Sequence, residues 1–344
     1  MKKYNVCIVG IGAVGKEMVR LLRKRNFPIE TITILARSAR QEVIDGEAID
    51  VVTASPEAFA GMDFAFFAGT EGSKGASRML GWEAVKRGCI VIDNGDDFRM
   101  DDRVPLVVPE VNPDALRGHQ GFVANPNCST IIALVAVAPI YRAAGLLRLI
   151  VSTYQAVSGS GSAAVQELED QTRAWAVGEQ GMAEVYPHPI AFNVIPQIGG
   201  VKDDTGSTSE ELKMQRETHK ILGDSSIRIS CTCVRVPVLN SHSEAIHMEL
   251  ERPLTVDAAR DILQSAAGVE VVDDVEKARY PTPLEASGKE VVQVGRIRPD
   301  ASFDAKGLAM FVAGDNLWKG AALNAIQIAE KMVELGVDAV PSPR

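Results

Sequence analysis

The stretch Tyr4-Asn-Val-Cys-Ile-Val-Gly-Ile-Gly-Ala-Val-Gly15 decides the fold of the first part of this chain. The residues before Gly10 form a short apolar run rich in β-branched side chains, which is typical of a buried strand. Residues 16–25 follow with apolar side chains at helical spacing, so Gly10, Gly12 and Gly15 form a Gly-x-Gly-x-x-Gly turn between strand and helix. This order predicts that a dinucleotide pyrophosphate binds at the helix N-terminus.

Further apolar runs with strand character follow the glycine turn, at residues 29–35, 64–68 and 89–92. A helical stretch, residues 73–87, lies between the last two. Because strands and helices alternate, we predict an α/β fold that begins with a doubly wound parallel sheet of the Rossmann type.

The pattern changes around residues 125–130. The elements expected after this point are a helix and two long apolar strands, over 131–144, 149–157 and 227–238. They predict an α+β second domain on a mostly antiparallel sheet, and residues 319–335 predict an amphipathic C-terminal helix.

The domain boundaries follow from this change of pattern. We predict a dinucleotide-binding domain of residues 1–127, completed by the C-terminal helix at about residues 316–344. The second domain would comprise residues 128–315.

The bulk composition excludes several classes of protein. The chain has 344 residues and a net charge of −9, so it can bury two cores and lacks the basic excess of a nucleic-acid-binding protein. No apolar run reaches the length of about 18 residues that a membrane span needs. The five cysteines suggest no disulfide framework, which predicts reduced thiols in the cytoplasm, and no His/Cys spacing predicts a structural metal.

The end of the second strand bears on the choice of cofactor. Residues 31–35 run into Ala36-Arg37-Ser38-Ala39-Arg40, where an NAD site would carry a carboxylate for the ribose hydroxyls. Arg37 and Ser38 instead suit a 2′-phosphate, which predicts NADP. The alternative is that Arg37 and Arg40 are solvated surface cations.

Cys128 is a candidate nucleophile because it lies just before a helical segment, where the helix dipole favours a thiolate. Most cysteines are small core residues. The preceding Asn125-Pro-Asn is too polar for a routine core strand, however, and this favours a functional thiol.

His242 is a candidate base, since it falls in a polar turn after an apolar strand. The other histidines lack such a context, and we interpret them as surface or structural residues: His119, His188, His219 and His247.

Blocks of sequence along nearly the whole chain carry a resemblance to a known family. They lie at residues 125–130, 152–159, 192–197, 210–213, 217–218, 235–238 with His242, 294–298 and 315–322. In this order they resemble the aspartate-β-semialdehyde dehydrogenase family.

The resemblance implies a reversible reaction in which aspartate semialdehyde, phosphate and NADP⁺ give aspartyl phosphate and NADPH. The reductive direction is the biosynthetic one, in the pathway to lysine, threonine and methionine. Cys128 matches the nucleophile, which forms a thiohemiacetal and then a thioester that phosphate cleaves. His242 matches the general acid/base. The second domain would be catalytic and would form a homodimer, with a tetramer left open.

Further roles are implied residue by residue. Substrate would be bound by Gln155, Glu210 and Arg235, and phosphate by Arg99, Asn127 and Lys213. The cofactor would contact Gly10, Gly12, Ala13, Val14, Gly15, Arg37 and Ser38 of the first domain and Ser158, Gly159 and Asn316 of the second.

The chain departs from the family pattern in the first domain and near its C-terminus. The glycine loop and the stretch after the second strand are shortened, and Trp318 stands where an arginine is usual. Asp96 and Asp97 precede Arg99, and they would repel a phosphate unless they point away or pair with Arg99.

Two alternatives stay open at this point. One is a paralogue or a related acyl-phosphate or acyl-thioester reductase that acts on a different acid. The other is a non-catalytic dimeric scaffold. The joint presence of Cys128, His242, Arg235 and Gln155 argues against the scaffold.

Overall fold

The opening strand and glycine turn lie in the first of two units of the computed structural model, which describes residues 2–69, 75–202 and 204–341. The first unit comprises Met1–Asn127 with Ala321–Arg344, and the second comprises Cys128–Gly320. Within the described part of the chain, no helix combines the length and the hydropathy that crossing a membrane requires.

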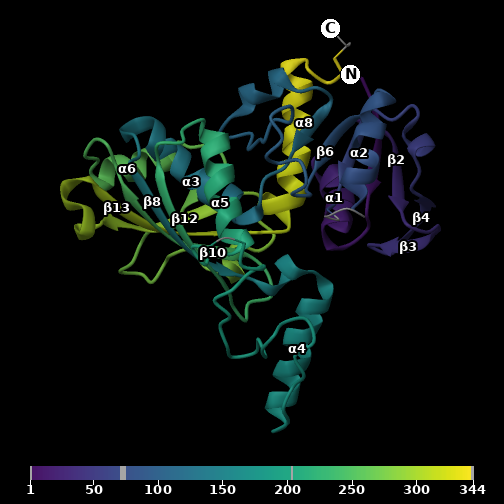
Figure 1. Cartoon of the computed structure of the whole chain (residues 1–344). Coiled ribbons are helices and arrows are strands. Elements are labelled where there is room, and N and C mark those ends of the chain that lie inside the picture. The colour runs from purple at the N-terminus through teal and green to yellow at the C-terminus, as the bar shows by residue number, and fades with distance from the viewer. Residues whose placement is uncertain (1, 70–74, 203, 342–344) are drawn as a thin grey trace. The chain divides into compact units, whose positions relative to one another are not determined.

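The first unit contains a seven-stranded sheet in the order β3-β4-β2-β1-β5-β6-β7. Its strands are β1 (Tyr4–Val9), β2 (Ile29–Ala36), β3 (Arg40–Ile44), β4 (Glu47–Thr53), β5 (Phe64–Phe67), β6 (Ile90–Asp93) and β7 (Phe122–Ala124). All neighbouring strands pair in parallel except β3 and β4, which form an antiparallel hairpin. The predicted doubly wound sheet is therefore confirmed, with β1 at the centre of the strand order. Figure 1 labels β2, β3, β4 and β6 of this sheet.

The described residues of this unit form three α-helices: α1 (Ala13–Lys24), α2 (Ala76–Lys86) and α8 (Leu323–Leu335). Helix α1 begins at Ala13, earlier than the predicted residue 16, because the helix starts directly after Gly12 inside the glycine turn. The β3–β4 hairpin was not predicted. Only Ile44 and Val51 of the hairpin are buried, so its sequence lacks the apolar pattern of a buried strand and is typical of a polar surface segment.

Glycine is required at two positions of the turn. A Cβ at Gly15 would lie 2.1 Å from the carbonyl oxygen of Gly10, so any side chain would push α1 away from β1. Gly10 itself has φ +100°, a conformation that side chains rarely adopt.

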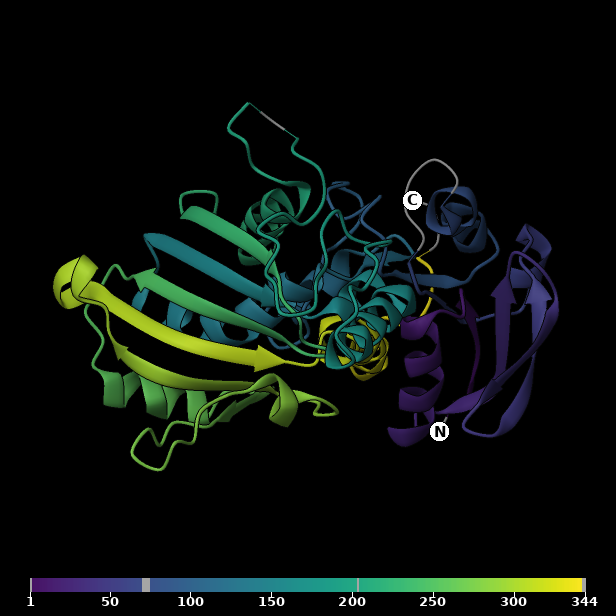
Figure 2. The same cartoon turned by 90° about the horizontal axis from the view of Figure 1, so that it is seen from below.

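The second unit contains a six-stranded sheet in the order β11-β12-β13-β10-β8-β9. Its strands are β8 (Arg148–Gln155), β9 (Arg228–Arg235), β10 (His242–Glu249), β11 (Val269–Val271), β12 (Val292–Pro299) and β13 (Gly307–Gly314). The three central pairings are antiparallel and the two outer ones are parallel. Figure 2 shows these strands side by side, with the yellow β13 beside segments from much earlier in the chain.

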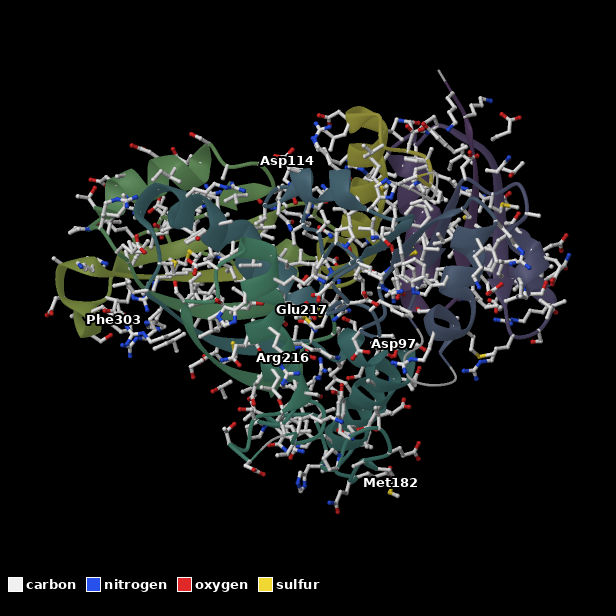
Figure 3. The ribbon with its side chains drawn as sticks, turned by 45° about the horizontal axis from the view of Figure 1, so that its top comes forward. Asp97, Asp114, Met182, Arg216, Glu217 and Phe303 are labelled. Carbon is white, nitrogen blue, oxygen red and sulfur yellow. The ribbon has the colours of Figure 1, made fainter. Side chains whose placement is uncertain are left out.

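Helices α3 (Cys128–Ala144), α5 (Ser209–Leu222) and α6 (Val256–Gln264) pack on this sheet and on one another, and the short α7 (Pro283–Ala286) contacts β13. Helix α4 (Ser162–Ala176) projects away from the sheet in Figure 1. The segment after it is held by Glu167, whose carboxylate accepts the backbone N–H of Glu184 at 2.8 Å. Met182 of this segment is 74% exposed (Figure 3).

Glu244 is a buried carboxyl group in the middle of this unit. It lies on β10 between Thr153 of β8 and Val312 of β13, and its side chain is fully buried. Neither carboxyl oxygen has a hydrogen-bond partner among the described residues. Burial raises the pKa of Glu244 well above its ordinary value, so the native state keeps the proton at pH values where an exposed glutamate has lost it.

Glu244→Gln should therefore stabilise the protein increasingly as pH rises. The unfolded chain releases the proton of Glu244 above about pH 4.3, whereas the native state keeps it. Native stability then falls by up to about 1.4 kcal/mol per pH unit until the raised pKa is reached, and glutamine removes this loss. Thermal unfolding of both proteins between about pH 5 and 8 measures the difference.

Glu249→Gln is the matched control, since Glu249 lies on the same strand but contacts Arg148 at 3.1 Å and Arg228 at 3.3 Å. Replacement of Glu249 should give no gain in stability that grows with pH. If the difference in Tm between Glu244→Gln and the native protein were the same at every pH, Glu244 would not carry a raised pKa in the native state.

Candidate active site

Three of the predicted site residues lie at one end of the second sheet. Gln155 ends β8, Arg235 ends β9 and His242 begins β10. Strands β8 and β9 are parallel with Gln155 opposite Arg235, and β10 runs antiparallel to β8. The end of two strands and the start of the third therefore meet, although the residues are up to 87 positions apart in the chain.

His242 is fully buried and has a defined tautomer. Its Nδ1 accepts a hydrogen bond from the backbone N–H of Ala156 at 3.0 Å. Because a backbone N–H can only donate, Nδ1 carries no proton, and the proton of the neutral ring lies on Nε2. Nε2 has no hydrogen-bond partner within the described residues. Burial first, and the charge of Arg235 second, hold the pKa of His242 well below its usual range, so the ring is neutral at neutral pH.

Arg235 contacts the carbonyl group of the same residue, Ala156. Its Nη1 donates to the carbonyl oxygen of Ala156 at 2.6 Å, and the side chain is 5% exposed. The guanidinium also lies over the ring of Tyr186, 6.0 Å from its centroid. The backbone of Ala156 thus links the arginine to the histidine.

Gly159 lies over both groups. A Cβ at this position would be 3.1 Å from Arg235 Nη1 and 3.2 Å from His242 Nε2. A side chain here would crowd the nitrogen that carries the histidine proton, so glycine leaves space beside this nitrogen.

Gln155 begins a chain of polar contacts that leads to helix α5. Gln155 Oε1 accepts a hydrogen bond from Thr153 at 3.0 Å, and Gln155 Nε2 donates to Glu210 Oε1 at 3.1 Å. Lys213, one turn further along the helix, lies 3.9 Å from the other oxygen of Glu210. The structure thus brings three predicted residues together from β8 and α5.

The first turn of α5 is placed by its cap. Thr208 accepts the backbone N–H of Glu211, whose carboxylate accepts the N–H of Thr208 in return. This capping box fixes where the helix begins and hence the position of Glu210.

Cys128 is the first residue of α3, the position at which a helix dipole stabilises a thiolate. Ile132, one turn along the same face, packs against Gly314, whose Cβ would lie 3.0 Å from Ile132 Cγ1. Gly314 is the residue of β13 opposite His242. The face of α3 that carries Cys128 is therefore turned toward the sheet end where His242 begins β10.

Gly320 packs directly against the cysteine. A Cβ on Gly320 would be 2.7 Å from Cys128 Cβ, so the backbone after β13 closely approaches the candidate nucleophile.

Asn316 connects the loop after β13 to two other loops of the site. Its Nδ2 donates to Ser158 Oγ at 2.9 Å, and its Oδ1 accepts the backbone N–H of Ser241 at 2.9 Å. Ser158 and Asn316, each predicted as a cofactor contact, are therefore hydrogen-bonded to one another, next to the residue that precedes His242.

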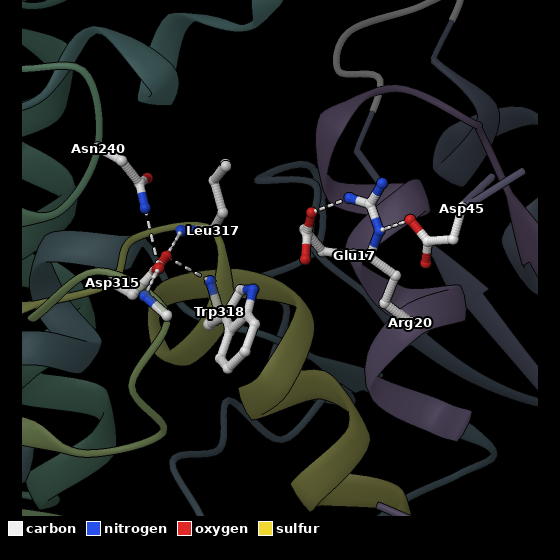
Figure 4. A network of polar contacts seen from close by, with 8 residues as sticks. Glu17, Arg20, Asp45, Asn240, Asp315, Leu317 and Trp318 are labelled. Carbon is white, nitrogen blue, oxygen red and sulfur yellow. Dashed lines mark hydrogen bonds and ion pairs between the residues drawn. The ribbon is translucent and has the colours of Figure 1, made fainter. Parts of the chain in front are cut away.

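Asp315, which was not among the predicted site residues, organises this loop (Figure 4). Its carboxylate accepts the backbone N–H groups of Leu317 at 2.9 Å and Trp318 at 3.0 Å, and the side-chain amide of Asn240 at 2.9 Å. In the sequence, Asp315 directly follows an apolar strand and begins the block at residues 315–322 that resembles the family. Trp318, the departure from the family pattern, has its backbone position set by this carboxylate.

In the first unit, Arg99 is 6% exposed and joins the ends of two strands. It donates to the carbonyl oxygens of Asn125 at 3.0 Å and Asn94 at 2.7 Å. Asn127, another predicted phosphate contact, is also 6% exposed.

In the acidic run before Arg99, Asp97 forms an ion pair with an arginine of helix α2. Asp97, labelled in Figure 3, pairs with Arg78 of α2 at 2.8 Å. The ion pair with Arg78 offsets the charge of Asp97, which reduces the expected repulsion of a phosphate. Asp93 accepts from Ser77 at 2.6 Å, and burial raises its pKa to about 6.

The glycine turn of the first unit leaves room for a ligand among the described residues. Within this part of the chain, a Cβ on Gly12 would meet no atom within 4 Å, and no side chain caps the N-terminus of α1. Arg37 and Ser38, in the turn after β2, are both exposed. These features fit the pyrophosphate and ribose phosphate of a dinucleotide.

Comparisons with known proteins match both units. Residues 5–119 match the family described as semialdehyde dehydrogenase, NAD binding domain, and residues 137–319 match semialdehyde dehydrogenase, dimerisation domain. Two aspartate-semialdehyde dehydrogenases, from Aquifex aeolicus and Bacillus subtilis, are each 46% identical to this chain over 97% of its length. The matched region covers 99% of the Aquifex aeolicus protein and 98% of the Bacillus subtilis protein. The crystal structure of aspartate semialdehyde dehydrogenase II from Vibrio cholerae, complexed with ASA, has a TM-score of 0.91 at 41% identity over 97% of this chain and 99% of that one.

Proposed function

Because the chain belongs to the aspartate-semialdehyde dehydrogenase family, we propose that it catalyses the reversible, NADP-dependent reduction of L-4-aspartyl phosphate to L-aspartate 4-semialdehyde and phosphate. The observation that carries the proposal is the set of Gln155, Arg235 and His242 at one sheet end, toward which the Cys128 face of α3 is turned.

Cys128 is the nucleophile in this proposal. In the reductive direction its thiolate attacks the acyl carbon of aspartyl phosphate, and phosphate leaves with the electron pair of the C–O bond, which gives a thioester. NADPH supplies the hydride that reduces this thioester. The resulting alkoxide re-forms a carbonyl group and the C–S bond breaks. The aldehyde is released, and the sulfur of Cys128 returns to the thiolate form.

His242 acts as a hydrogen-bond donor to the substrate oxygen. The resemblance implied a general acid/base, but Nδ1 is occupied by the N–H of Ala156 and the neutral ring presents Nε2–H. A donor at this position stabilises the negative oxygen that forms each time the carbonyl carbon becomes tetrahedral. The steps above need no proton to be removed by the ring.

Arg235 and Glu210 suit the two charged groups of an amino-acid substrate. A planar guanidinium binds a carboxylate through two hydrogen bonds, and a carboxylate accepts from an ammonium group. We assign the α-carboxylate to Arg235 and the α-amino group to Glu210, with Gln155 beside the reacting carbon. Arg99, Asn127 and Lys213 are assigned to phosphate.

The cofactor-binding residues are proposed from each unit separately. In the first unit these are Gly10, Gly12, Ala13, Val14, Gly15, Arg37 and Ser38, and in the second Ser158, Gly159 and Asn316. The open N-terminus of α1 supports the first set, and the contact of Asn316 with Ser158 supports the second.

We further propose a homodimer in the cytoplasm. The match to a dimerisation domain over residues 137–319 supports the assembly. The five free cysteines support a reducing compartment.

A steady-state assay with the purified chain tests the proposed function. Formation of NADPH should require aspartate semialdehyde, phosphate and NADP⁺ together. Succinate semialdehyde, which lacks the amino group, should be used at least about 100-fold less efficiently, because the ionic contact between the substrate amino group and Glu210 would be lost. Equal use of both aldehydes would favour a reductase for another acid. NADP binding without any turnover would favour a paralogue that has lost the reaction.

A further inference from the structure

Basic residues along one face of α1 pair with acidic residues of the β3–β4 hairpin. The pairs, with their N–O distances, are Lys16–Glu42 at 3.3 Å, Arg20–Asp45 at 2.9 Å and Arg23–Glu47 at 2.8 Å. The second pair, together with Glu17, is drawn in Figure 4. Because the basic residues recur every three or four positions, they share one helix face, and the hairpin is held along this face.

Glu42 differs from the other two hairpin carboxylates because it binds a second cation. Its Oε1 accepts a hydrogen bond from Arg40 Nε at 2.9 Å, while Oε2 lies against Lys16. Arg40 also donates through Nη1 to the carbonyl oxygen of Ser38 at 3.3 Å. Hydrogen bonds from Arg40 first and Lys16 second lower the pKa of Glu42, so the group is ionised at neutral pH.

The position of these contacts connects them to cofactor choice. Lys16 follows the last glycine of the glycine turn, and Arg40 closes the turn that carries Arg37 and Ser38. In a dinucleotide-binding unit, the turn after the second strand contacts the ribose 2′ substituent. The sequence has no carboxylate at the end of β2, but the hairpin brings one to this turn from β3.

We propose that Glu42 determines the degree of preference for NADP over NAD. Its carboxylate binds Lys16 and Arg40, which flank the glycine turn and the turn that carries Arg37 and Ser38, and it repels the expected 2′-phosphate itself. An NAD ribose carries a neutral hydroxyl group at this position and meets no such repulsion. The inference rests on the proposed function, because it requires a nicotinamide dinucleotide at the glycine turn.

Binding of nucleotide fragments to the full-length chain tests the proposal without catalysis. In Glu42→Gln, the Kd for 2′,5′-ADP should fall about 3- to 10-fold, since a unit charge near a dianion in solvent contributes an interaction of this size. The Kd for 5′-AMP should change by less than about 2-fold, because this ligand has no 2′-phosphate. The gain should shrink in about 0.5 M salt, where exposed charges are screened.

Asp45→Asn is the matched control. It removes one carboxylate from the same hairpin and frees Arg20, but it leaves the contacts of Glu42 intact. Neither Kd should change by more than about 2-fold.

The inference is overturned if Glu42→Gln leaves the Kd for 2′,5′-ADP unchanged or raises it. An equal gain in Asp45→Asn also overturns it, because net charge would then explain the effect. If the native chain binds 5′-AMP as tightly as 2′,5′-ADP, the NADP part of the proposed function fails. The effect of Glu42→Gln on the two ligands still decides the role of Glu42.

Discussion

Cys128→Ala should abolish turnover, with a loss of kcat of about 10⁴-fold or more, and leave the affinity for NADP unchanged. The thiolate forms the only covalent bond between protein and substrate in the proposed reaction, and removal of an enzyme nucleophile has effects of this size. Alanine has no group that can replace the thiolate. Since the cysteine begins α3 and is partly exposed, its loss should not unfold the chain.

The measurement pairs steady-state turnover with NADP binding and thermal unfolding of the same preparation. Cys231→Ala is the control, because Cys231 lies within β9 and away from the sheet end that carries His242. It should keep nearly native activity. If Cys128→Ala retains more than about 1% of native kcat, a covalent thioester is not the route of the reaction.

His242→Ala should lower kcat about 10²- to 10³-fold, which is the cost of removing one hydrogen-bond donor from a developing oxyanion. His242→Gln should be less impaired, because a glutamine side chain can present an amide N–H near the former Nε2 position. Glutamine cannot act as a base. A base mechanism therefore predicts that both variants are equally impaired, and the comparison separates the two roles.

The pH dependence gives an independent test of the same residue. The depressed pKa of His242 means that the ring stays neutral as pH falls through about 6.5, the usual value for histidine, and protonates only well below it. Activity should therefore show no inflection near this pH, and the ring ¹⁵N chemical shifts should show Nδ1 unprotonated and Nε2 protonated. An inflection near pH 6.5 that is absent in His242→Gln would contradict the fixed donor.

Local sequence patterns predicted much of the fold. The run from Tyr4 to Gly15 predicted a strand, a turn and a helix, because apolar periodicity and glycine placement depend on neighbouring residues alone. The β3–β4 hairpin escaped prediction since most of its side chains are exposed, and exposed strands lack an apolar pattern. Likewise, the start of α1 at Ala13 follows from the glycine turn and not from the amphipathic pattern.

The sequence by itself determined which residues are candidates for the site, and ordered blocks of residues related them to a family. Only the tertiary structure decided what these residues contact. The N–H and C=O groups of Ala156 fix His242 and Arg235, Asp97 pairs with Arg78, and Glu42 reaches the turn after β2 from another strand. The physical reason is that a hydrogen bond or ion pair depends on strand register and helix packing, which place residues far apart in the chain within a few ångströms. Residue type and spacing specify the chemistry that a side chain can perform, while its protonation state and its partners are properties of the folded chain.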